Sequence, residues 1–144
     1  MSGMQPELWV ERPSAAVAFY ERAFGATTLH RVGDGDDIVA QLAVGEARFW
    51  VASADSTIGR FSPEAIGGRT SRILLVVDDP VAVLRRAVTE GATETAPVDE
   101  EHGWRLGRIL DPHGHEWEIG TPLRLAANAT GASPPPPERG RGWR

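Results

Sequence analysis

The chain contains the same pattern of elements twice, and this duplication limits the folds open to it more than any other feature. In the first half the apolar stretch ELWVER precedes Pro13 and the helical pattern PSAAVAFYERAFGAT; in the second, RILLVVDD precedes Pro80 and PVAVLRRAVTEGAT. Proline suits the first turn of a helix, where its missing N–H costs nothing. Pro13 and Pro80 are 67 residues apart, and Gly25 and Gly91, which follow the helices, are 66 apart. We therefore expect two copies of one folding unit.

Three strand-like segments follow each helix and complete a βαβββ pattern in both halves. Short turns rich in glycine and acidic residues separate them. The segments span residues 27–33, 37–45 and 47–53 in the first half and 93–98, 104–110 and 115–120 in the second. Each helix carries an apolar stripe that needs a sheet to cover it. The sequence predicts an α+β fold in which two tandem βαβββ modules form a curved mixed sheet, a half-barrel that encloses a cleft.

The predicted boundaries follow from the repeat and from a change of composition near the end. The first module covers residues 1–55, a linker covers 56–70, and the second module covers 71–125. Residues 126–144 contain four consecutive prolines, small residues and arginines, and offer little to bury. We expect this segment to be a disordered tail.

Composition restricts the function. The 144 residues carry a formal charge of -5, include no cysteine, and have arginine at all 15 basic positions. Thiolate ligands, a cysteine nucleophile and a catalytic lysine are therefore excluded. The acidic balance argues against binding to nucleic acid or to an anionic membrane surface and favours a small-molecule ligand. The first residues lack the basic and apolar regions of a signal peptide, so a cytoplasmic location is expected.

Two motifs resemble a known superfamily. AxxFYxRAFGA lies at Ala16–Ala26, and GWRLGRILDPHGHEW, which leads into a DPxGxxxE pattern, lies at Gly103–Trp117. Together with the duplicated module they resemble the vicinal-oxygen-chelate superfamily of glyoxalase I, extradiol dioxygenases and bleomycin-resistance proteins, in particular its PhnB-like branch, over about residues 6–122. The resemblance implies two half-barrels around a cleft. In enzymatic members a divalent metal there chelates two substrate oxygens, held by four ligands, commonly His or Glu, from the first and last strand of each half.

This chain matches that ligand set at one position. The resemblance places the first ligand near Gln5, the second at Phe49 or Trp50, and the third at Arg72. An arginine cannot ligate a cation and would repel one. Only Glu118, the final residue of DPxGxxxE, is a family-type ligand. We therefore expect no cofactor.

A bound divalent metal remains the alternative, and its candidate ligands would be Glu7 and Glu118. Glu7 lies two residues after Gln5, on the same strand face. Glu116 and Glu118 also share a strand face, about 7 Å apart, which makes Glu116 the candidate catalytic base. We favour an ion pair between Arg72 and these carboxylates over catalysis. Trp117, on the opposite face, is expected in the core.

Aromatic residues and one arginine suggest what the cleft binds. A flat, apolar ligand with polar edges suits aromatic walls beside a few charged groups. The predicted ligand-binding residues are Trp9, Trp50, Phe61, Arg72, Trp104 and Glu118.

Two functions from different classes fit these observations. The first is a metal-free binding protein of the glyoxalase/bleomycin-resistance type that sequesters an aromatic natural product or metabolite. The alternative is a metal-dependent lyase, isomerase or dioxygenase in which Glu116 acts as base. A structural module with a filled cleft is a third possibility. Relatives pair their half-barrels within one chain or between two, and we expect a homodimer.

Overall fold

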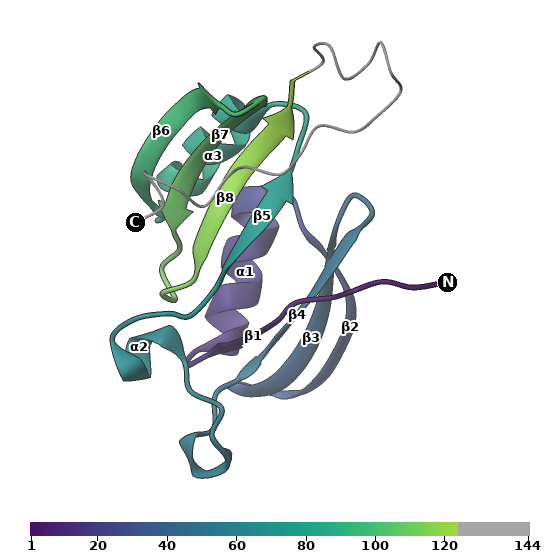
Figure 1. The fold of residues 1–144 in the computed structure, drawn as a ribbon. Helices are drawn as coiled ribbons and strands as arrows, with labels where there is room; N and C mark the ends of the chain where they lie inside the picture. Colours follow the sequence, from purple (N-terminus) through teal and green to yellow (C-terminus); the bar gives the residue numbers. More distant parts are fainter. Residues whose placement is uncertain (124–144) are drawn as a thin grey trace.

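The computed structural model describes residues 1–123 and contains two four-stranded sheets, each with one helix against it (Figure 1). The predicted tail, residues 126–144, lies outside the described residues. The first module contains β1 (Glu7–Val10), α1 (Pro13–Phe24), β2 (Thr27–Asp34), β3 (Asp37–Val44) and β4 (Ala47–Ser53). The second contains β5 (Arg72–Val76), α3 (Pro80–Thr89), β6 (Thr93–Glu101), β7 (Trp104–Leu110) and β8 (Glu116–Pro122). The predicted α+β fold of two βαβββ modules is confirmed.

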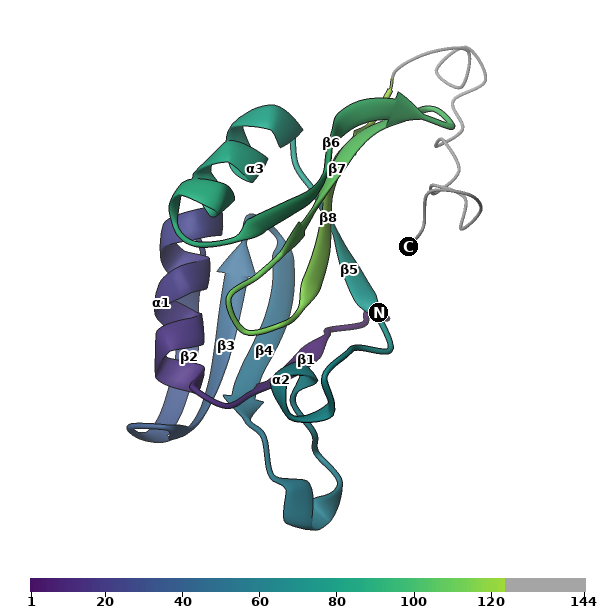
Figure 2. The same ribbon diagram turned by 90° about the vertical axis from the view of Figure 1, so that its left-hand side faces the viewer.

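Both sheets have the same topology. Their strand orders are β1-β4-β3-β2 and β5-β8-β7-β6. In each, the first strand runs parallel to the last, and the other pairs are antiparallel. Figure 2 shows α1 and α3 on the same side of the molecule. We call the face of each sheet that points away from its helix the open face.

The segment between the modules has structure of its own. It contains a 3₁₀ turn (Ser56–Ile58) and the short helix α2 (Pro63–Ile66). The Ser62 hydroxyl caps α2 by accepting a hydrogen bond from the Ala65 N–H, and Gly67 ends it with a positive φ of 68°. Serine, proline and glycine in this order are ordinary signals for helix ends, but the segment was expected only as a linker, without a helix.

Helix α1 ends where the sequence predicts and contributes most of the aromatic core. Gly25 adopts the left-handed conformation, with φ of 68°, which glycine reaches without steric cost. The rings of Tyr20 and Phe24 pack against Trp117 of β8, with the Phe24 and Trp117 centroids 4.8 Å apart. Trp117 is 1% exposed, so its predicted place in the core is confirmed. Aromatic packing thus joins the helix of the first module to the last strand of the second.

A buried carboxylate reinforces this junction. Asp111 lies in the turn between β7 and β8, where Oδ2 accepts hydrogen bonds from the Tyr20 hydroxyl and the Trp117 indole N–H. Oδ1 accepts the backbone N–H groups of His113 at 2.8 Å and His115 at 3.1 Å. Burial and the negative charge of Asp111 raise the pKa of the Tyr20 hydroxyl well above its ordinary value, so this hydroxyl stays a donor. The aspartate of DPxGxxxE therefore fixes a turn and anchors a helix from the other module.

The structure corrects two details of the sequence analysis. A histidine in the turn after Pro112 is expected to be exposed, but His113 is 4% exposed, because its backbone N–H donates to the buried Asp111 carboxylate. Burial lowers the pKa of the His113 imidazole below its ordinary value. Strand β6 continues through Glu100 and Glu101, beyond the strand predicted at residues 93–98. The hairpin needs only His102 and Gly103, whose φ angles of 50° and 83° suit a two-residue turn.

Replacing Asp111 tests its role. Asp111→Asn replaces one carboxylate oxygen with an amide nitrogen, which cannot accept hydrogen bonds. At least one buried donor therefore loses its acceptor. We expect the free energy of unfolding to fall by about 2–4 kcal/mol, measured by urea denaturation. Tyr20→Phe removes one donor and should cost less. The control, Asp36→Asn in the exposed β2–β3 turn, should change stability by less than about 0.5 kcal/mol; equal effects at Asp36 and Asp111 would contradict this role.

Candidate functional site

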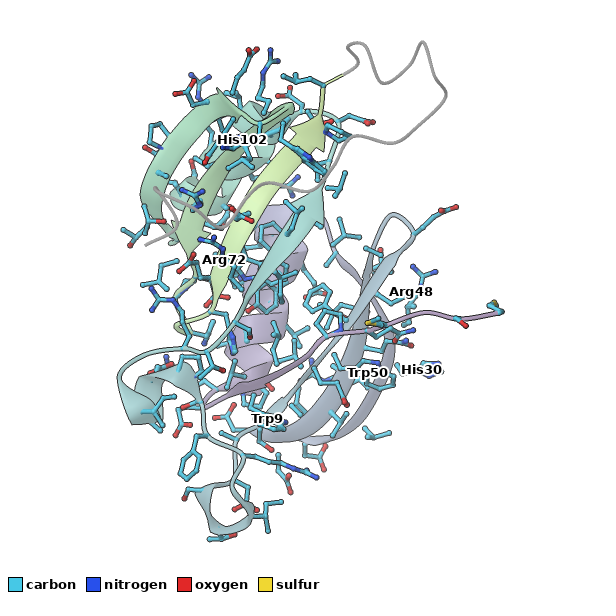
Figure 3. All side chains as sticks on the ribbon, viewed as in Figure 1. Trp9, His30, Arg48, Trp50, Arg72 and His102 are labelled. Carbon is cyan, nitrogen blue, oxygen red and sulfur yellow. The ribbon has the colours of Figure 1, made fainter. Side chains whose placement is uncertain are left out.

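The open face of the first sheet carries a hydrogen-bonded set of neutral side chains. Trp50 on β4 lies beside Gln41 on β3. Gln5, just before β1, accepts hydrogen bonds at its Oε1 from the Trp50 indole N–H at 2.8 Å and from Gln41 Nε2 at 3.0 Å. Figure 3 shows Trp50 and Trp9 on this sheet. The amide oxygen at the family's first ligand position is therefore engaged by two donors.

The open face of the second sheet carries a charged set in the equivalent place. One guanidinium nitrogen of Arg72 lies 2.7 Å from Glu116 Oε2, and the other lies 3.7 Å from Glu118 Oε2. Arg108 on β7 donates from Nε to the same oxygen of Glu118 at 3.1 Å. Glu118 is only 1% exposed. The predicted ion pairing of Arg72 with these carboxylates is confirmed, and Arg108 is a partner that the sequence analysis missed.

Glu116 has two arginine partners of its own. Besides Arg72, Arg69 donates from Nε to Glu116 Oε1 at 3.1 Å. Burial opposes ionisation of Glu116, but the hydrogen bonds from Arg72 and Arg69 outweigh it and lower the pKa of this carboxyl below its ordinary value. A general base that works near neutral pH has a pKa close to 7. The environment of Glu116 moves its pKa in the opposite direction, which favours an ion pair over a catalytic base.

The two sets are copies of each other in the internal repeat. Gln5, Trp50 and Gln41 precede Arg72, Glu118 and Arg108 by 67 or 68 residues, the offset that relates the two prolines. In the second sheet β5, β8 and β7 each contribute one side chain to the set. In the first sheet β4 and β3 contribute one each, and the third comes from Gln5, two residues before β1. The offset relates Gln41 to Arg108 once either residue is known, but it does not single out either one from the sequence.

These residues do not fit the metal that the family resemblance implies. Gln5 is engaged by two N–H donors, Trp50 is not a ligand, and Arg72 carries a positive charge. The carboxylate of Glu118 lies within 4 Å of guanidinium groups from Arg72 and Arg108, so a cation there would meet two like charges. Glu7, the substitute candidate, lies on β1 in the other sheet. Within residues 1–123, no group of three or more His, Asp or Glu residues is placed to hold a metal ion.

The predicted ligand-binding residues occupy different parts of the chain. Trp9, which is 36% exposed, and Phe61 line one pocket of about 170 Å³ beside α2, together with Arg69, Glu7 and His115. The His115 imidazole is hydrogen-bonded to the Trp9 carbonyl oxygen at 3.0 Å. Trp50 lies on the first sheet, whereas Arg72, Trp104 and Glu118 lie on the second. The structure thus brings Trp9 together with Phe61, and Arg72 together with Glu118.

Comparison with known proteins identifies the family. A model of the Glyoxalase/Bleomycin resistance protein/Dioxygenase superfamily matches residues 5–119. The chain belongs to this superfamily. An uncharacterized protein of Mycobacterium bovis is 35% identical to this superfamily member over 127 residues, which cover 84% of this chain and 84% of the relative.

Solved structures share the fold. TioX from Micromonospora sp. ML1 superposes with a TM-score of 0.64 at 26% identity, over 86% of this chain and 98% of TioX. A glyoxalase/bleomycin resistance protein/dioxygenase family enzyme from Burkholderia phytofirmans superposes with a TM-score of 0.67 at 19% identity, over 81% of this chain and 95% of the other, and at this identity supports the fold alone. Among the described residues, no helix is long and apolar enough to cross a membrane.

The ion-pair cluster makes a prediction about stability. Glu118→Gln leaves the buried guanidinium of Arg108 beside a neutral amide, and removing one partner of a buried pair costs about 3–5 kcal/mol. Glu116→Gln should cost less, because the Glu116 side chain is 12% exposed against 2% for Glu118. Urea denaturation gives both values, with the exposed Glu94→Gln as control. If Glu118→Gln proved no less stable than the control, Glu118 would not be a structural ion-pair partner.

Proposed function

We propose that this protein binds a small molecule without a metal ion, as a binding protein of the glyoxalase/bleomycin-resistance type. The observation that carries the proposal is the state of the family's ligand positions. Gln5 is hydrogen-bonded to Trp50 and Gln41, and Glu118 is held between Arg72 and Arg108. A metal would have to displace both sets, and on the second sheet this would separate a buried carboxylate from its arginine partners.

The open faces favour an aromatic ligand, which we propose to be a natural product or metabolite of the kind that an antibiotic-resistance protein sequesters. Trp9 and Trp50 offer indole faces on the first sheet, and Arg72 and Glu118 offer charged groups on the second. Aromatic walls with a few polar groups suit a flat ligand with polar edges. The motifs at Ala16–Ala26 and Gly103–Trp117 support placing the protein in the PhnB-like branch.

We further propose that two copies pair to complete the binding cleft. Trp9, Ala52, Val39 and Val32 form a row across the open face of the first sheet, one residue from each strand. Val32 is 65% exposed, Val39 41% and Trp9 36%. A second copy that places its second sheet over this row would bury these side chains. It would also bring the tryptophans of one copy opposite Arg72 and Glu118 of the other.

Ligand binding and metal content can be measured on one preparation. Protein purified without chelators should contain metal well below one equivalent by elemental analysis, and it should bind an aromatic natural product from a screening panel at one equivalent per chain. Mass spectrometry should recover the ligand unchanged.

Trp9→Ala should raise the Kd for this ligand about ten-fold, equivalent to about 1.4 kcal/mol. The matched control is Val81→Ala on α3, where the side chain is 37% exposed. Stoichiometric metal together with turnover of the ligand would favour the metal-dependent lyase, isomerase or dioxygenase.

The proposed pairing predicts a response to one charge. Val39→Glu places a carboxylate in the centre of the apolar row and should convert the dimer to a monomer in sedimentation velocity experiments. Val88→Glu on α3 is a matched control, because Val88 is 39% exposed and Val39 is 41% exposed. The control should remain a dimer. A wild-type monomer at all concentrations, or a dimer that Val39→Glu leaves intact, would rule out pairing through this face.

A further inference from the structure

A pocket of about 410 Å³ lies where the two modules meet, and we call it the seam pocket. Its volume falls within the range of about 300–1,000 Å³ typical of small-molecule sites. Residues 3–6, the start of β4 and the strand β5 form its walls. None of Trp9, Trp50, Arg72 and Glu118 is among its lining residues. The seam pocket is therefore distinct from the open-face residues assigned above to the aromatic ligand.

Apolar groups dominate the lining of the seam pocket. Ile73, Leu74 and Val76 contribute from β5, and the buried rings of Phe49 and Trp117 also line it. The segment at residues 3–6 forms the opposite wall, and it is held in place because Gln5 is hydrogen-bonded to Trp50 and Gln41. The pocket therefore suits a hydrocarbon chain or an aryl-alkyl group.

One cation lines this apolar pocket. Arg48, on β4, contributes to the lining, and Figure 3 shows it near the N-terminal segment. One guanidinium nitrogen, Nη1, donates to the carbonyl oxygens of Gly45 at 3.0 Å and Ala47 at 3.3 Å. These two bonds orient the guanidinium through the β3–β4 turn. Within residues 1–123 Arg48 forms no ion pair, and the exposed Glu46 is the acidic residue of the lining.

We propose that the seam pocket binds an apolar carboxylic acid, whose carboxylate pairs with Arg48 and whose chain lies between β5 and residues 3–6. A guanidinium recognises a carboxylate with charge-assisted hydrogen bonds. An apolar wall beside a single oriented cation selects an acid over an amide or an amine with the same chain. This site does not depend on the proposed function, since none of the residues proposed to bind the aromatic ligand lines it and it requires no second copy.

The test compares three probes of matched chain length: octanoate, octanamide and octylammonium. Isothermal titration calorimetry on the full chain should show octanoate binding at one equivalent, about ten-fold tighter than octanamide, with octylammonium the weakest. Arg48→Gln should weaken octanoate to the level of octanamide, and Arg48→Lys, which keeps the charge, should recover part of the difference. Arg85→Gln, an exposed arginine on α3, is the matched control and should bind octanoate like the wild type.

A second variant tests the position of the chain independently of Arg48. Val76 lines the pocket but is 56% exposed, so Val76→Glu should fold and should repel octanoate. Val88→Glu on α3 is its control. Trp9→Ala should leave octanoate binding unchanged, which separates this site from the aromatic-ligand site. The proposal is overturned if octanoate fails to bind, if octanamide binds equally well, or if Arg48→Gln leaves the affinity for octanoate unaltered.

Discussion

Asp111 is charged and almost completely excluded from water, and four donors replace its hydration: a phenol, an indole and two backbone N–H groups. The geometry of these donors determines how the modules fit together. The backbone donors shape the turn before β8, the indole sets the rotamer of the central core tryptophan, and the phenol belongs to the helix of the other module. Because a buried carboxylate is tolerated only when its oxygens are satisfied, α1 cannot shift relative to β8 without breaking this set. The positions of the open faces and of the seam pocket therefore depend on this junction.

The repeat made most of the fold predictable. Pro13, Gly25 and their counterparts mark helix ends by well-defined local chemistry, and alternation in HEWEIG correctly assigned Trp117 to the core. The short helix at Pro63–Ile66 and the inward position of His113 were not predicted. The helix has signals at its ends but too few residues to show an apolar period. His113 is buried because Asp111 accepts bonds from Tyr20, 91 residues earlier, and such a contact has no local signature.

The candidate site was predictable in part. Strand alternation and the family pattern located Arg72 beside Glu116 and Glu118, and the structure confirms those ion pairs. Arg108 and Gln41 escaped notice because each lies on a strand where the family pattern has no ligand, so their roles depend on cross-strand register. Register is set by turn geometry and by the buried face together, and a bulge of one residue would have moved either side chain to the other face. The grouping of Trp9 with Phe61 depends on the path of the connecting segment, which local sequence does not determine.

The two arginines beside Glu118 also limit how this protein could acquire a metal. A family-type ligand set would require new donors at two or more positions and removal of the positive charge near Glu118. Replacing only Arg72 leaves Arg108 in contact with Glu118, and the remaining guanidinium would still compete with any cation. If both arginines were replaced before a metal could bind, the buried carboxylate of Glu118 would lose the counter-charges of Arg72 and Arg108. Each single replacement is therefore unfavourable. Several simultaneous replacements would be needed to convert this site into that of a metal-dependent relative.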